Sequence, residues 1–143
     1  MTHADAGKYA AKRRGAKLDE RIAARLREKV SENRISCAEA HGIAAELNVA
    51  PADVGTAIDL LEARIVKCQL GLFGHGREKN IPALSGKIDP DMEQAIKSGL
   101  VNSRLPCAAS WEIASRFNIS RPMMAAVCES MKIKVSPCQL GAF

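Results

Sequence analysis

Aromatic residues are scarce in this chain of 143 residues: they make up 3% of it, although hydrophobic residues of all kinds make up 47%. An interior filled by Ala, Ile, Leu, Val and Met suits the packing of helix on helix better than a β-sandwich. A chain of this length holds one domain of ordinary size or two very small ones. The composition therefore predicts a small, mainly α-helical protein and speaks against a large multi-layer enzyme.

Long apolar runs are also missing. No run approaches the roughly 18 to 20 residues that cross a bilayer, and the basic N-terminal segment is not followed by an apolar signal-peptide core. We therefore expect a cytoplasmic protein without a membrane partner. The sequence also lacks a Gly-rich phosphate loop, a Ser/His/Asp set, an H-E-x-x-H motif and a paired-carboxylate pattern, so no catalysis is expected.

Positive charge is present, and it is unevenly placed. The net charge is +5, and the first 34 residues carry ten basic and five acidic side chains, while the rest of the chain is balanced. A basic cluster of this kind is typical of nucleic-acid binding. We interpret residues 1–17 as a basic arm that contacts phosphate groups; the alternative is a solvated tail that only aids solubility.

The chain contains an internal duplication with an offset of 70 residues and no gap. Cys-Gln-Leu-Gly at 68–71 returns at 138–141, and Ile43, Ala44 and Asn48 return as Ile113, Ala114 and Asn118. A period of this length indicates a duplicated domain, not a solenoid array. Helices are expected at 18–30, 38–47 and 52–63 and again at 90–101, 108–117 and 122–131, with strands at 64–70 and 134–140.

The middle of each copy resembles the winged helix-turn-helix superfamily. Ala44 and Ala114 are the small residues that let the next helix cross closely, and Asn48 and Asn118 occupy a turn that needs a positive φ. The resemblance implies two tandem winged units at 18–76 and 88–143, joined by a linker at 77–87. The second copy stops at Phe143, so its wing is expected to be truncated, and its open strand edge suggests a homodimer.

The same resemblance implies a DNA-binding transcriptional regulator, but few side chains at the recognition positions can read bases. The first copy offers little beyond Thr56, and two carboxylates, Asp53 and Asp59, would face phosphates there. The competing interpretation is a protein-interaction or dimerisation scaffold that does not bind DNA. The candidate DNA contacts are Lys12, Arg13, Arg14, Lys17, Arg21, Thr56, Ser120 and Arg121.

Four of the five cysteines are repeated: Cys37 with Cys107, and Cys68 with Cys138. Pairing of the strands would bring the cysteines of each copy together, which suggests a redox switch or a site for zinc or an iron–sulfur cluster. The close C-x-x-C spacing of convincing metal sites is absent, and buried cysteine is common, so structural burial is the alternative and no cofactor is otherwise expected. The fifth, Cys128, aligns with Ile58 and is expected in the core.

Overall fold

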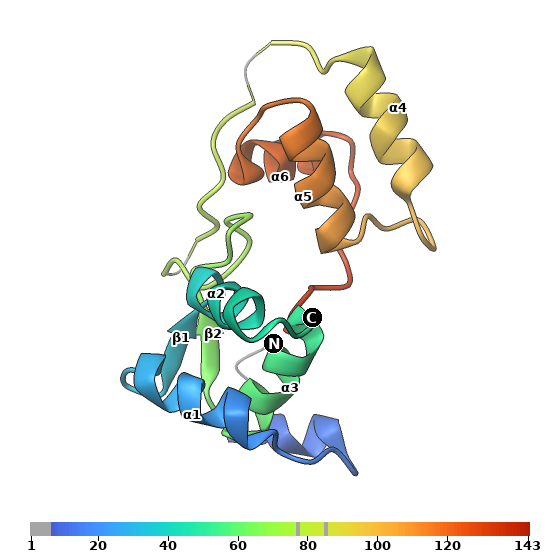
Figure 1. The fold of residues 1–143 in the computed structure, drawn as a ribbon. Helices are drawn as coiled ribbons and strands as arrows, with labels where there is room; N and C mark the ends of the chain where they lie inside the picture. Colours follow the sequence, from blue (N-terminus) through green and yellow to red (C-terminus); the bar gives the residue numbers. More distant parts are fainter. Residues whose placement is uncertain (1–6, 77, 85) are drawn as a thin grey trace. The chain divides into compact units, whose positions relative to one another are not determined.

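The computed structural model describes residues 7–76, 78–84 and 86–143 (Figure 1). The chain is mainly α-helical, as its composition predicts, and it divides into two compact units. Unit 1 comprises the described residues up to Cys68 together with Gln139–Ala142, and unit 2 comprises the described part of Gln69–Cys138 together with Phe143. No helix in the described part of the chain is long and apolar enough to cross a membrane.

Unit 1 packs its helices over a pair of short strands. Ile35 of the first strand lies opposite Ile65 of the second in a parallel pairing, and both side chains are buried. The elements are the 3-10 helix η2 (Tyr9–Arg13), α1 (Glu20–Lys29), β1 (Arg34–Ser36), α2 (Cys37–Leu47), α3 (Pro51–Leu60) and β2 (Arg64–Val66).

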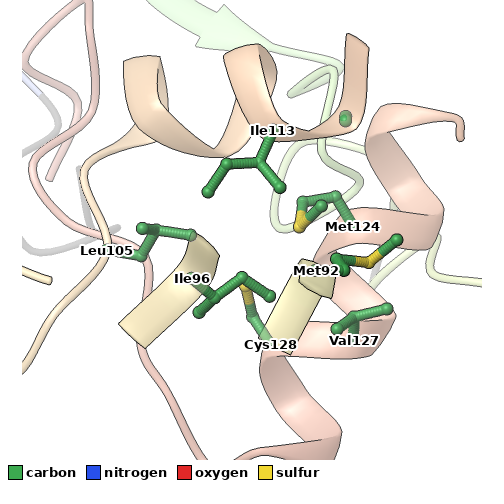
Figure 2. Packing of buried hydrophobic residues seen from close by; sticks show 8 residues of the cluster. Met92, Ile96, Leu105, Ile113, Met124, Val127 and Cys128 are labelled. Atoms are coloured by element: carbon green, nitrogen blue, oxygen red, sulfur yellow. The ribbon is translucent and has the colours of Figure 1, made fainter. Parts of the chain in front are cut away.

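Unit 2 repeats the three helices as α4 (Pro90–Gly99), α5 (Cys107–Arg116) and α6 (Arg121–Ser130). All three helices contribute to its core, in which Ile96 of α4, Ile113 of α5 and Met124 of α6 converge (Figure 2). Among its described residues, strand pairing is reduced to isolated bridges, a parallel one between Leu105 and Val135 and an antiparallel one between Val101 and Arg104.

The helices begin where capping residues stand in the sequence. The Asp19 carboxylate accepts hydrogen bonds from the first turn of α1, and the Asp89 carboxylate accepts one from the first turn of α4, as expected for N-caps. Ser36 and Glu39 form a reciprocal capping box at the start of α2. All six predicted helices are confirmed, with ends that differ from the predicted ones by a few residues.

The predicted strands are too long. The strand expected at 64–70 ends at Val66 because Lys67 adopts a left-handed conformation with φ 53°, which leaves the extended region. The strand expected at 134–140 is only the bridge at Val135, and Pro137 has no N–H to donate to a ladder. In the described residues the only sheet is the parallel β1–β2 pair, so a wing hairpin is not among their elements.

Residues Gln139–Ala142, near the end of the chain, are part of unit 1, and Figure 1 draws this segment in red beside α3. The Leu140 side chain is 1% exposed, and its backbone lies so close to Gly55 of α3 that a Cβ added there would stand 1.8 Å from the Leu140 oxygen. The corresponding stretch of the first copy is counted with unit 2, where Gly71 and Asn80 share a backbone hydrogen bond of 2.8 Å. The compact units therefore differ from the sequence repeats 18–76 and 88–143 at this segment.

Candidate nucleic-acid interface

The turn between the second and third helices is the same in both units. Asn48 and Asn118 both have φ 54°, which confirms the left-handed conformation predicted for them. The N–H of the following residue returns to the carbonyl of Ala44 or Ala114 over 3.0 Å in each case. This closure satisfies the carbonyls at the end of the preceding helix and fixes where α3 and α6 begin.

The start of α3 offers little to a nucleic acid. Its cap residue is Ala50 and its first turn carries Pro51 and the exposed Asp53. The hydroxyl of the candidate Thr56 donates to the Ala52 carbonyl over 3.0 Å within the same helix. A carboxylate at this position repels phosphate, so this helix start is a poor reader of DNA.

The start of α6 has polar side chains, but they have partners inside the protein. The Ser120 hydroxyl accepts a hydrogen bond of 3.2 Å from the Met123 N–H as the helix N-cap. The Arg121 guanidinium lies over the Trp111 ring at 3.6 Å and donates to the Gln69 side-chain oxygen. Both candidates therefore have structural roles, and nothing in the sequence predicts the Arg121–Trp111 stack.

The described part of the N-terminal arm is packed on α3. Tyr9 is 3% exposed, and the N–H groups of Tyr9 and Ala10 donate to the Glu62 carboxylate over 2.9 and 2.7 Å. Arg13 Nε donates to Asp59 Oδ2 over 2.8 Å, and Lys12 Nζ lies 3.6 Å from the same oxygen. Asp59 is 1% exposed, so the prediction that it would face phosphates is wrong: it points inward, and Lys12 and Arg13 neutralise it as a buried carboxylate.

The other three arm-side candidates face solvent. Arg14 and Lys17 are exposed, and no ion pair involves them in the described part of the chain. Arg21 is exposed as well, and its guanidinium lies 3.6 Å from the Asp19 carboxylate that caps α1. Among the candidate DNA contacts, these three cations are the ones whose charge is most available to an acidic polymer.

The repeated cysteines follow the paired strands. The Cys107 N–H donates to the Pro137 carbonyl over 3.0 Å, so the Cys107 backbone lies beside the residue that precedes Cys138. Cys37, Cys68 and Cys107 are buried and Cys138 is half-buried. Among the described residues, no three His, Cys, Asp or Glu side chains are placed to hold a metal ion together.

The remaining cysteine, Cys128, lies in the core of unit 2, as its alignment with Ile58 predicts (Figure 2). Burial raises the pKa of Cys128 to about 11. Its thiolate fraction at neutral pH is therefore about a hundredfold smaller than that of an exposed cysteine. We expect Cys128 to be alkylated by iodoacetamide more slowly than the half-buried Cys138, which peptide mapping of time points would measure; faster labelling of Cys128 would contradict its burial.

Comparisons with known proteins give no relative from which a function could be carried over. No family model, no curated protein and no solved structure matches this chain.

Proposed function

We propose that this protein is a DNA-binding regulator that holds duplex DNA mainly through the phosphate backbone. The observation that carries the proposal is the identical turn that joins α2 to α3 and α5 to α6, with a left-handed asparagine in each. Two helices joined in this way resemble the helix-turn-helix motif of DNA-binding proteins. The net charge of +5 supports an acidic partner.

Contacts to phosphate fit the two helix starts better than contacts to bases. Asp53 is exposed at the start of α3, and the polar groups of Thr56, Ser120 and Arg121 already have partners within the protein. Phosphate contacts set position without reading sequence, and they make binding strongly dependent on salt. A regulator of this kind selects its sites weakly by itself.

Arg14 and Lys17 are the cations of the arm that we assign to phosphate. They are exposed and lie within four residues of the end of η2, so the packing of η2 on α3 holds them near the body of unit 1. A tethered cation loses less conformational freedom on binding than one on a loose tail.

The double substitution Arg14→Gln, Lys17→Gln is expected to weaken binding to a mixed-sequence duplex. Each phosphate contact contributes about 0.9 to the slope of log affinity against log salt, so the slope should fall by about two. Fluorescence anisotropy over a series of salt concentrations measures both quantities.

The matched control is Lys97→Gln, Arg116→Gln, which removes the same charge from two exposed cations already paired with Glu93 and Glu112. The control should bind more tightly than the arm variant. If the unaltered protein does not bind the duplex even at low salt, the DNA proposal fails. The interaction scaffold then becomes the better hypothesis, and the exposed Val101 side chain, 57% accessible, is where a protein partner would first be sought.

A further inference from the structure

Two like charges lie opposite each other at the start of the strand pair in unit 1. Arg34 of β1 is the register partner of Arg64 of β2. The next pair, Ile35 and Ile65, is buried at 1% exposure on both sides. Because successive side chains of a strand point to opposite faces, both arginines lie on the outer face, on strands about 4.8 Å apart.

Unit 2 has the same arrangement with a different second residue. The Leu105 N–H donates to the Lys134 carbonyl over 3.0 Å, and Leu105 is bridged to Val135. Arg104 and Lys134 therefore stand opposite each other as Arg34 and Arg64 do, and both are exposed. All four of these paired positions carry a basic residue, although most neighbouring residues differ between the two copies.

A tight turn fixes the first cation of each pair. Glu32 and Asn33 have φ of 50° and 61°, and two backbone hydrogen bonds of 3.0 and 2.9 Å join Ser31 to Arg34. The equivalent turn in unit 2 joins Val101 to Arg104 by hydrogen bonds of 2.7 and 3.1 Å. These turns hold a left-handed conformation without glycine, which costs energy that the surrounding structure must supply.

Neither pair is neutralised. Like charges directly opposite each other in a sheet destabilise it. In the described part of the chain no carboxylate lies within ion-pair distance of these four residues, whereas exposed cations such as Lys79 and Lys97 do have acidic partners. A cost that both copies keep at the same place suggests a role outside folding.

We propose that each cation pair binds a phosphate group of a nucleic-acid backbone, Arg34 with Arg64 in unit 1 and Arg104 with Lys134 in unit 2. A guanidinium matches a phosphate through two parallel hydrogen bonds, and a second cation on the adjacent strand adds charge to the same anion. Arg34, Arg104 and Lys134 are exposed and Arg64 is half-buried, so each pair presents accessible positive charge to a polymer. The inference rests on the DNA-binding function proposed above and adds two contacts to it.

The test compares two double variants, Arg34→Gln with Arg64→Gln and Arg104→Gln with Lys134→Gln, in the full chain. Each should lower the salt slope of binding to a mixed-sequence duplex by about one. Each should also keep or raise the midpoint of thermal unfolding, because a repulsion is removed. Lys97→Gln, Arg116→Gln again serves as the control of equal charge.

The outcomes separate the two proposals. If the variants bind DNA with the same affinity and salt slope as the control, the cation pairs do not bind phosphate, while the proposed DNA-binding function is unaffected. A lower unfolding midpoint than that of the control also overturns them, since it would give the cations a structural role. If the unaltered protein does not bind DNA, inorganic tripolyphosphate is the probe: amide NMR shifts at Arg34 and Arg104 that the variants lose support the anion sites, and unchanged spectra overturn them.

Discussion

Replacing Leu140 with alanine is expected to destabilise unit 1, although this residue belongs to the second sequence repeat. Leu140 is 1% exposed and its backbone lies against Gly55 of α3. Loss of a buried leucine side chain that leaves a cavity costs about 2–5 kcal/mol. Hydrogen–deuterium exchange resolved by peptide should show a larger increase in exchange rate, relative to the unaltered protein, in α1 and α3 than in α4 and α5.

The control for this result is a substitution in the core of the other unit. Ile96 of α4 is 0% exposed among the core residues of unit 2. Ile96→Ala should accelerate exchange in α4, α5 and α6 and shift the fluorescence transition of Trp111, the single tryptophan of the chain. If Leu140→Ala instead loosened only α4 to α6, the end of the chain would belong to unit 2.

The same contact can be tested from the side of the helix. A methyl group on Gly55 would clash with the Leu140 backbone, whereas one on Gly42 of α2 would meet no atom within 4 Å. Alanine is a better helix former than glycine by about 1 kcal/mol. Gly42→Ala should therefore stabilise unit 1, while Gly55→Ala should destabilise it by about 1–3 kcal/mol because the clash outweighs the helix propensity.

Local signals in the sequence were enough to predict the six helices and the two turns. Capping by Asp19 and Asp89 and the left-handed Asn48 and Asn118 depend on residues close by in the chain. The sequence could not predict which of the two repeated Cys-Gln-Leu-Gly segments packs onto which unit. Both copies read Cys-Gln-Leu-Gly, so either copy satisfies the pattern of buried residues equally well.

The candidate interface was predicted less well than the fold, for a related reason. A count of basic residues does not tell which cations are already paired. Arg13 and Asp59 are separated by 46 residues, and Arg121 reaches Gln69 across 52. Only the fold brings these partners together and leaves Arg14 and Lys17 exposed.

Substituting Arg13 with glutamine is expected to destabilise unit 1 by about 1–3 kcal/mol, because a buried carboxylate loses its hydrogen-bonded cation. Asp59 is 1% exposed, and Oδ1 has no hydrogen-bond partner in the described part of the chain. Lys12 stays 3.6 Å from Oδ2 and limits the loss. Urea unfolding followed by circular dichroism gives the free energy of unfolding.

The neighbouring Arg14→Gln removes the same charge from an exposed side chain and should change the free energy of unfolding by less than about 0.5 kcal/mol. In DNA binding the order should reverse, with Arg14→Gln the weaker binder at temperatures where both variants are folded. The double variant Arg13→Gln, Asp59→Asn should recover part of the stability, because the amide carries no charge that needs a partner. An Arg13→Gln protein as stable as Arg14→Gln would show that the Asp59 pair does not anchor the arm. Arg13 would then be a candidate contact for phosphate, like Arg14 and Lys17.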